Sequence, residues 1–477
     1  MNKAHKIGND YVFTAPQDKL NIIGAFYETI NSPRHLNSNT PHKQLIDETA
    51  ESIKNNFKIS RDLVNTITQF SRENPASNPN SIYNHLHPFC NPWSIELIFK
   101  NLPNKTSSGL DNIPPIVLKH LPRNIKWDLA ILFNNAINHH YFPKIWKKAE
   151  VLPILKKGKI PCDPSSYQPI SLTPSISKVF ESVINTNIVD FCNTNNIIPD
   201  YQFGFRYQHS TTHAIHKLSS DLNTLVARSQ FVGAALLDIE KAFDSVWLNG
   251  LLYKLHKKQC PRWLIYQIWD MISSKTFLTW DGENLSTEEF SITEGLQQGT
   301  VNSPILFNIL LSDLPNLFNL NDNGKSYALA FADDLIVYTT ANNVNTVKDN
   351  LEDLVEKINQ YYMTWNLRLN PTKCETILFR KPLHNLSSKY KVGSRDFRIA
   401  TTIPGTNDKT NIPHKNVVKY LGVHIDYLLR GNKHIDVQLE KAKLAFKLQN
   451  YYFLHLTAEF CIISISLSKL RLYYTCY

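Results

Sequence analysis

The sequence predicts an α+β fold whose antiparallel sheet carries acidic side chains at the ends of its strands. Residues 328–338 are two apolar, β-prone runs joined by an Asp-Asp pair, which is the pattern of a hairpin with a tight turn. A second apolar run, 232–237, ends on Asp238. Downstream, Ser303 and Pro304 precede an apolar stretch and supply the expected N-cap and first position of a helix.

The adjacent carboxylates of Asp333 and Asp334 repel each other, so one takes up a proton unless a strong cation lies beside them. A lone Asp-Asp pair is more often simple turn chemistry. Asp238 at the end of a second strand favours a metal site over simple turn chemistry. Two strand ends that each carry an acidic side chain can hold the two Mg²⁺ ions that catalyse a phosphoryl transfer. The pattern therefore predicts a metal-dependent site at these strand ends.

Three segments in this order, 237–244, 295–304 and 331–334, resemble motifs A, B and C of reverse transcriptases. They are most similar to those of non-LTR retrotransposons of the jockey/LINE kind. The resemblance implies a right-hand polymerase with fingers, a palm built on an antiparallel sheet, and a partial helical thumb. It also implies RNA-directed DNA synthesis from dNTPs on an RNA template, with a DNA primer or target.

The resemblance divides the chain into four expected parts. Residues 1–92 form an N-terminal helical connector and linker, 93–230 a fingers-like region, 231–427 the palm with motifs A to E, and 428–477 a partial thumb. The last part is expected to have an atypical or truncated C-terminus, because 454–477 departs from the family pattern. In the family an endonuclease precedes the connector; none is expected here, so a nicking activity is expected from elsewhere.

By resemblance, Asp238 and Asp333 bridge two Mg²⁺ ions, Asp334 contributes or tunes, and Mn²⁺ is a possible substitute. Phe243 stands where the family carries its sugar gate, a ring that excludes a 2′-hydroxyl. Ordinary core packing is the alternative for that ring. Asp244 is expected to be a structural acid that orders the turn.

The expected nucleotide-binding residues come from several motifs. Gln298 and Gly299 belong to motif B, where glycine lets the backbone approach the templating base pair. Lys156 lies in a lysine-rich loop that can meet a triphosphate, and Lys373 is placed by resemblance near the pyrophosphate; for both, a solvated surface lysine is the alternative. Gln168 replaces an arginine that is usual in the family, and glutamine cannot form the planar bidentate grip on phosphate.

Five residues are expected to contact nucleic acid. They are Arg206, then Tyr420 and Gly422 in a segment that resembles the primer grip, and Lys443 and Lys447 on a thumb helix. A lone Arg206 is more often an ordinary surface residue. The formal net charge of +10 suits a polyanionic partner such as nucleic acid.

The sequence predicts an intracellular protein of cytoplasm and nucleus with no membrane association. Its 7 cysteines are dispersed without a CxxC pair, which is typical of reduced thiols. The start lacks the apolar core of a signal peptide, and the apolar run 460–467 is too short to cross a bilayer.

Two alternatives to an active polymerase remain at this point. The first is a catalytically impaired remnant that still binds nucleic acid, which the glutamine at 168 favours and the intact aspartates oppose. The second is a relative of intron-encoded maturases, which would need a dedicated RNA-binding extension that the sequence does not reveal.

Overall fold

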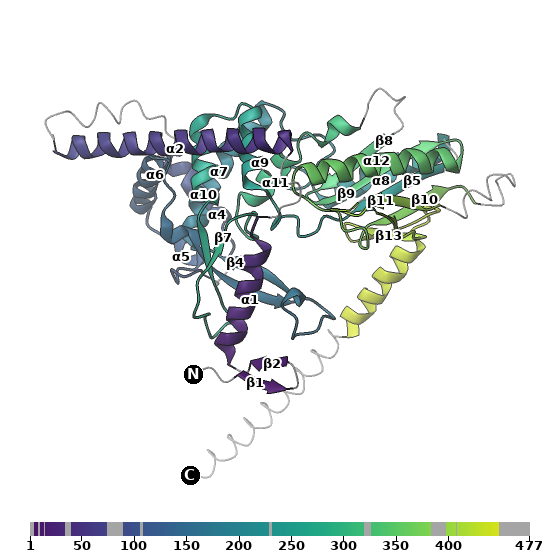
Figure 1. Ribbon diagram of the computed structural model, residues 1–477, viewed down its shortest axis with the longest axis horizontal. Coiled ribbons are helices and arrows are strands. Elements are labelled where there is room, and N and C mark those ends of the chain that lie inside the picture. The colour runs from purple at the N-terminus through teal and green to yellow at the C-terminus, as the bar shows by residue number, and fades with distance from the viewer. Residues whose placement is uncertain are drawn as a thin grey trace, which may run out of the picture.

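The computed structural model describes residues 4–7, 10–13, 15–33, 40–73, 89–104, 108–228, 231–318, 326–382, 397–406 and 408–447. A helical part lies at the left in Figure 1, and the sheet that includes β5, β8, β9 and β10 lies at the right. Within the described part of the chain, none of the helices is both long and apolar enough to cross a membrane.

The central sheet has the strand order β10-β5-β9-β8, and every neighbouring pair is antiparallel. Its strands are β5 (Phe231–Leu237), β8 (Ser326–Phe331), β9 (Asp334–Ala341) and β10 (Glu375–Arg380). The predicted hairpin and the predicted strand before Asp238 are both confirmed. They form because apolar runs suit a sheet that is buried on both faces, and β9 also contains several β-branched residues, which favour strands.

Alternate residues of these strands enter two different cores, as the period of a strand requires. On β5, Phe231 and Ala235 face the core that also contains α12 (Val344–Thr364). Val232 and Ala234 face the core that also contains α8 (Thr211–Arg228). Helices therefore cover both faces of the sheet and hold its strand ends in place.

A second sheet has the order β4-β3-β6-β7. Its strands are β3 (Lys148–Leu155), β4 (Tyr167–Leu172), β6 (Lys275–Thr279) and β7 (Phe290–Ile292), with β3 and β6 parallel. The N-terminal helix α1 (Pro16–Ile30) packs on β6 and β7. The hairpin of β3 and β4 projects from this sheet and carries the predicted lysine loop.

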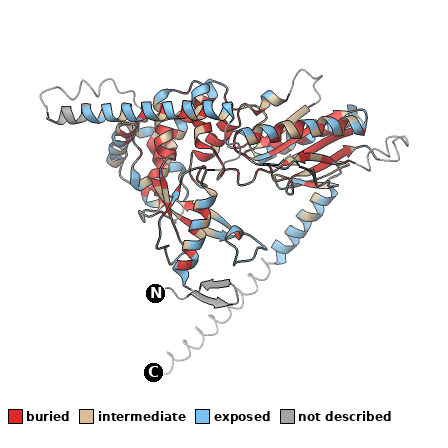
Figure 2. Cartoon of the chain, in the orientation of Figure 1, coloured by how far each residue is buried: buried red, intermediate tan, exposed pale blue. Residues whose placement is uncertain are grey.

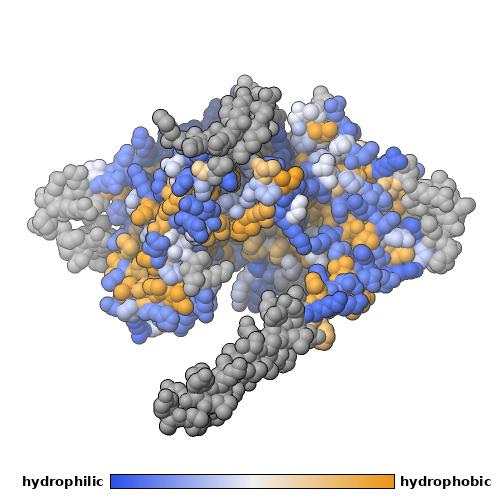
Figure 3. Space-filling view, turned by 90° about the horizontal axis from the view of Figure 1, so that it is seen from below, coloured by the Kyte–Doolittle hydropathy of each residue, from blue (hydrophilic) through white to orange (hydrophobic). Residues whose placement is uncertain are grey.

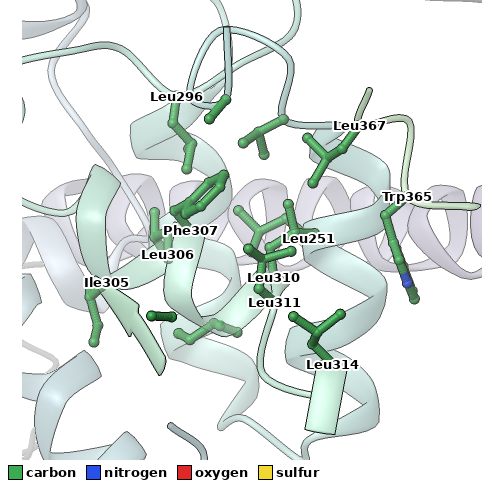
Figure 4. Close-up of a cluster of buried hydrophobic side chains, with 14 of the residues drawn as sticks. Leu251, Leu296, Ile305, Leu306, Phe307, Leu310, Leu311, Leu314, Trp365 and Leu367 are labelled. Carbon is green, nitrogen blue, oxygen red and sulfur yellow. The ribbon is translucent and has the colours of Figure 1, made fainter. Parts of the chain in front are cut away.

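The remaining described helices pack mainly around the largest core, whose buried residues are red in Figure 2. They are α2 (Pro41–Glu73), α4 (Pro92–Asn101), α5 (Pro115–Lys119), α6 (Arg123–Asn138), α7 (Ser175–Thr194), α9 (Leu248–Lys257), α10 (Arg262–Ile272) and α11 (Ser303–Leu310). Figure 4 shows the apolar side chains of α11 among those of neighbouring segments, including Leu251, Leu296 and Leu367. This packing fixes the segment that precedes α11.

The predicted start of α11 is wrong by one residue. Its N-cap is Asn302, whose side chain makes no capping hydrogen bond, and Ser303 is the first helical residue. The Ser303 hydroxyl instead bonds the hydroxyl of Thr300 at 2.5 Å and the carbonyl of Gln297 at 2.9 Å. Because these partners lie in the preceding loop, Ser303 ties that loop to the helix.

Three small antiparallel pairs complete the described strands: β1 (Ala4–Ile7) with β2 (Asp10–Phe13), β11 (Ile399–Thr402) with β12 (Lys409–Ile412), and β13 (Val417–Tyr420) with β14 (Val423–Asp426). A helix over 432–447 follows, with exposed apolar side chains at Ile435 and Leu439. The predicted atypical segment 454–477 lies outside the described residues.

The surface seen from below differs between its two sides. Apolar side chains gather on the side of α4, α5 and α6, and hydrophilic ones cover much of the sheet side (Figure 3). The exposed apolar residues of α4 and α6 include Trp93, Leu97, Trp127 and Ile131.

Candidate active site

Two neighbouring strands deliver the three aspartates to one end of the central sheet. Asp238 directly follows β5, Asp333 lies in the turn between β8 and β9, and Asp334 begins β9. Because Leu237 pairs with Leu335 in antiparallel register, Asp238 continues its strand beside Asp334. The structure thus brings these carboxylates together although almost a hundred residues separate them in sequence.

Burial is the main cause of a raised pKa at all three carboxyl groups, and neighbouring carboxylates add to it at Asp333 and Asp334. Burial and the charges of Asp333 and Asp238 together raise the pKa of Asp334 to about 6. Burial, and then the charge of Asp238, raises the pKa of Asp333. Burial also raises the pKa of Asp238, against the opposing charge of Lys373. Such crowding of negative charge is relieved by a cation, which favours ionised carboxylates.

Lys373 lies beside the aspartates, with its Nζ 3.7 Å from Oδ2 of Asp238. The turn that carries it is fastened to the end of β5. The Asn370 amide donates to the Asp238 carbonyl at 2.9 Å, and the Asp238 amide donates to Sγ of Cys374 at 3.3 Å. Lys373 therefore lies next to Asp238, and its predicted position near the pyrophosphate stays a prediction. Nothing in the sequence pointed to this role of Cys374, which is fully buried.

A groove of about 380 Å³ opens at this end of the sheet. Asp238, Asp334 and Lys373 line it, together with Glu375, Lys419 and the turn between β13 and β14. Glu375 and Lys419 were missed from sequence because each looks like an ordinary charged residue of a strand. Their positions show that the predicted primer-grip segment shares one groove with Asp238 and Asp334.

Tyr420 and Gly422 differ in their access to this groove. Tyr420 is only 3% exposed, and its hydroxyl donates to the Leu329 carbonyl at 3.4 Å. This burial places its side chain in the wall of the groove, and the expected contact of Tyr420 with nucleic acid stays a prediction. Leu421 and Gly422 form the turn with φ of 45° and 86°, as two-residue hairpins require. A Cβ on Gly422 would meet no atom within 4 Å, so space is open there.

The donor chemistry of the groove fits a hard divalent cation. Among the described residues, no group of three or more His, Cys, Asp or Glu side chains is arranged to hold a metal ion on its own. Mg²⁺, however, usually takes one or two protein carboxylates and completes its octahedron with water and substrate phosphates. Asp238 and Asp334 both line the groove, and Oδ2 of Asp238 has no hydrogen-bond partner. These two carboxylates suit that kind of site.

Motif B is held against motif A by a pair of side chains. Nε2 of Gln298 lies 3.2 and 3.3 Å from the two carboxylate oxygens of Asp244 and donates to them. Gly299 has a φ of 97°, and a Cβ there would meet the Ser171 carbonyl oxygen of β4 at 3.0 Å. The Ser171 amide in turn donates to the Gln298 carbonyl at 3.4 Å. Asp244 therefore orders more than its own turn, because it links motif A to motif B.

Phe243 is half-buried between the core and the surface. Its ring stacks on Phe307 of α11, with centroids 5.0 Å apart and planes inclined by 30°. The core-packing alternative is thus observed for one side of the ring. The ring is only partly buried, so part of it stays accessible from outside the core.

The hairpin of β3 and β4 carries the other two expected nucleotide contacts. Gln168 is exposed on β4 opposite Ile154 of β3. Lys156 follows β3, and its Nζ donates to the Ser165 carbonyl at 3.1 Å. Both side chains therefore lie on one hairpin, which reaches motif B through Ser171.

The three remaining basic residues are not joined to the groove by any observed contact. Arg206 donates to the carbonyls of Pro199 and Gln202 at 3.1 and 3.3 Å and lies 3.8 Å from Oδ1 of Asp200. These contacts favour a structural role for Arg206 over the expected contact with a template. Lys443 and Lys447 are exposed on the helix over 432–447, and Lys443 pairs with Glu440 at 3.0 Å.

Comparison with known proteins gives consistent similarities. The family model described as reverse transcriptase (RNA-dependent DNA polymerase) matches residues 154–425. The RNA-directed DNA polymerase from mobile element jockey of Drosophila melanogaster is 31% identical over 345 residues, which are 72% of this chain and 36% of that protein. The probable RNA-directed DNA polymerase from transposon X-element of the same fly is 30% identical over 364 residues, 76% of this chain and 38% of that protein.

The chain therefore spans 36% and 38% of the length of these two relatives. Among solved structures, apo telomerase from Candida tropicalis shows a TM-score of 0.42 at 13% identity. That match covers 60% of this chain and 48% of the telomerase chain.

Proposed function

This chain belongs to the reverse transcriptase (RNA-dependent DNA polymerase) family, and on that premise we propose that it catalyses RNA-directed DNA synthesis for a non-LTR retrotransposon of the jockey kind. The observation that carries the proposal is the meeting of Asp238, Asp333 and Asp334 at adjoining strand ends, above a groove that also holds Lys373. The reaction joins a deoxynucleotide to the 3′-hydroxyl of a primer and releases pyrophosphate.

Asp238, Asp333 and Asp334 are the carboxylates that would hold Mg²⁺, or Mn²⁺ in its place: Asp238 and Asp333 as the resemblance implies, with a contribution from Asp334, which lines the groove beside Asp238. Two such ions, when bound, would lower the pKa of the primer hydroxyl and neutralise charge on the triphosphate. The ammonium of Lys373, whose Nζ is 3.7 Å from the Asp238 carboxylate, would attract the same phosphates. A role for Asp334 in holding a cation agrees with its raised pKa, because a bound cation would displace the proton.

The nucleotide is expected to lie between the groove and the β3–β4 hairpin. Gln298 and Gly299 would border that space from motif B, and Lys156 and Gln168 would border it from the hairpin, which is joined to motif B by the hydrogen bond between Ser171 and Gln298. Phe243 would pack against C2′ of the sugar, so that dNTPs are preferred to rNTPs.

The partners follow from this reaction: an RNA template, a DNA primer or target end, and dNTPs. Gly422 leaves open space beside its backbone, and Lys419 brings a positive charge to the groove. Both features would suit the phosphate backbone of a nucleic acid. We also propose that an endonuclease activity supplies the primer end and that the protein works in the cytoplasm and nucleus. The segments 1–92, 93–230, 231–427 and 428–477 would be connector, fingers, palm and thumb.

Primer extension on poly(rA)/oligo(dT) with dTTP and Mg²⁺ tests the proposal. Wild-type protein should extend the primer, and Asp333→Ala should lose at least about 100-fold in rate while binding the same duplex with nearly unchanged affinity. Asp349→Ala, which removes an exposed carboxylate from α12, is the matched control and should extend normally. Undiminished extension by Asp333→Ala would overturn the assignment.

A second candidate function is nucleic-acid binding without turnover. The exposed Gln168 favours it, because glutamine lacks the charge of the arginine usual in the family at this position. The same assay separates the two: tight binding of poly(rA)/oligo(dT) by wild-type protein with no extension in Mg²⁺ or Mn²⁺ identifies the impaired copy.

A further inference from the structure

The backbone of the aspartate turn is gripped by one buried side chain from a distant segment. Gln202 lies between α7 and α8 and is 4% exposed. Its Nε2 donates to the Ala332 carbonyl at 3.1 Å, and its Oε1 accepts from the Ala332 amide at 2.9 Å. Both polar ends of this amide therefore act on Ala332, the residue that precedes Asp333.

Ala332 is a residue that needs such support. It has a φ of 60°, in the left-handed region that residues with a Cβ adopt only at a cost. It is also buried, so its amide and carbonyl need partners from the protein. Gln202 supplies both partners, and this stabilises the backbone conformation that directs Asp333 and Asp334 to the end of the sheet.

The segment around Gln202 is itself fixed on two sides. Ala330 of β8 donates its amide to the Tyr201 carbonyl at 2.8 Å and accepts at its carbonyl from Phe203 at 2.8 Å. The Gly204 amide donates to Oε1 of Gln202 at 2.8 Å. Nδ2 of Asn308, on α11, donates to the Gly204 carbonyl at 2.9 Å. The turn is thus coupled through this segment to the helix that follows motif B.

Gly204 shows how closely the two backbones approach. A Cβ at this position would meet the Ala332 amide nitrogen at 2.3 Å, which is far inside van der Waals contact. Any side chain there would push the aspartate turn away. Two residues therefore fix the position of the Ala332 backbone independently: Gly204 by its close approach, and Gln202 by its two hydrogen bonds.

We propose that Gln202 is a positioning residue for catalysis, which sets the backbone of the Ala332–Asp333 turn and so the direction of the two carboxylates that follow. It acts through Ala332 and does not touch substrate. The inference rests on the proposed polymerase function for its consequence in catalysis, but the grip on Ala332 can be measured without activity.

Kinetics provide the first test. Gln202→Leu keeps the volume and removes both bonds, and Gly204→Ala displaces the turn while leaving the glutamine in place. Both should lower kcat by about 10- to 100-fold, because small misplacement of a reacting group has effects of that size. The KM for dNTP and the affinity for poly(rA)/oligo(dT) should stay within about twofold, because the substrate contacts are intact. A rise in KM with unchanged kcat would overturn the proposal.

The matched control is Asn359→Leu. Asn359 also has a buried side-chain amide that donates to a backbone carbonyl, that of Thr402 in β11, at 2.8 Å, but it lies on α12. Asn359→Leu should lower the melting temperature about as much as Gln202→Leu does, and it should leave kcat unchanged. An equal loss of kcat in the control would reduce Gln202 to a residue of general stability.

Amide hydrogen exchange provides the second test and needs no turnover. In wild-type protein the Ala332 amide should be protected, and Gln202→Leu should speed its exchange at least about tenfold, an increase that Asn359→Leu should not produce. If the Ala332 amide of Gln202→Leu stays as protected as in wild-type protein, Gln202 does not hold this backbone group and the proposal fails. If wild-type protein fails to extend primers while Gln202→Leu still speeds exchange of the Ala332 amide, the result counts against the proposed function and leaves the contact between Gln202 and Ala332 supported.

Discussion

The ammonium of Lys373 lies 3.7 Å from the Asp238 carboxylate, although 135 positions separate the two residues in sequence. Both side chains are partly exposed, with 67% of the lysine and 40% of the aspartate accessible. Exposed ion pairs of this kind contribute little to stability, so the lysine is free to exchange the carboxylate for a phosphate. The pair is therefore better suited to chemistry than to holding the fold.

Replacing Lys373 by Met should lower kcat for primer extension by about 100-fold if the ammonium donates a proton to the leaving pyrophosphate. It should also raise the pKa of Asp238 further, since the lysine charge now opposes the upward effect of burial. The acid limb of the pH–rate profile should then move to higher pH. Lys373→Arg keeps the charge and should restore the position of that limb. An acid limb that stays in place in Lys373→Met would contradict this account.

Asp334 should make stability depend on pH in protein kept free of metal by EDTA. Its folded pKa of about 6 exceeds the unfolded value of about 3.9, so the folded state binds the proton more tightly. The stabilisation is complete below the unfolded pKa and is lost as the pH rises through the folded pKa.

Asp334→Asn should therefore raise the free energy of unfolding at pH 7 by about 1 kcal/mol, a figure reduced for solvent screening of a partly exposed group. At pH 4 it should change the free energy much less. Denaturant titration at the two pH values measures this, with Asp349→Asn as the exposed control. A loss of stability at pH 7 would show that the carboxylate has a stabilising partner in the folded state.

The parts of the fold that were predicted from sequence have strong local signals. The apolar runs of β5, β8 and β9 and the Asp-Asp turn are visible in single stretches of chain, and with the motif resemblance they gave the α+β, right-hand polymerase class, which the family match confirms. The placement of Asp238 beside Asp334 also followed, because the motifs that contain them are recognisable.

The parts that were not predicted depend on which distant segments meet. The side chains of Gln202 and Cys374 act on backbone groups more than 100 positions away, and their own sequence neighbourhoods contain no sign of it. The inward direction of Tyr420 follows from the alternation of side chains along β13, which its resemblance to a family motif did not reveal. Such outcomes are decided by strand register and packing.

Gln168→Arg should lower the KM for dNTP by about tenfold. Position 168 is exposed on β4, and a guanidinium there can grip a triphosphate with two charge-assisted hydrogen bonds that the amide cannot form. Steady-state extension with varied dTTP measures the effect. Cys162→Arg adds the same charge to an exposed position of the same hairpin and should change KM little. Equal effects of both substitutions would indicate general electrostatic attraction.

Phe243→Val should weaken the discrimination against ribonucleotides. The ring is held in place by its stack on Phe307, so in the wild-type protein it should stay at the position proposed for the sugar of the nucleotide. Valine removes the outer part of the ring, and a 2′-hydroxyl should then fit. The ratio of kcat/KM for dTTP to that for UTP on a poly(rA) template should fall at least about tenfold.

Phe191→Val is the control for this substitution, because Phe191 of α7 is also half-buried against the main core. It should reduce stability to a similar extent and leave the ratio unchanged. If Phe243→Val lowers the melting temperature without altering the ratio, Phe243 is a packing residue only, and sugar selection depends on another side chain. If both variants change the ratio alike, the effect comes from loosening of the core that Phe243 and Phe191 share.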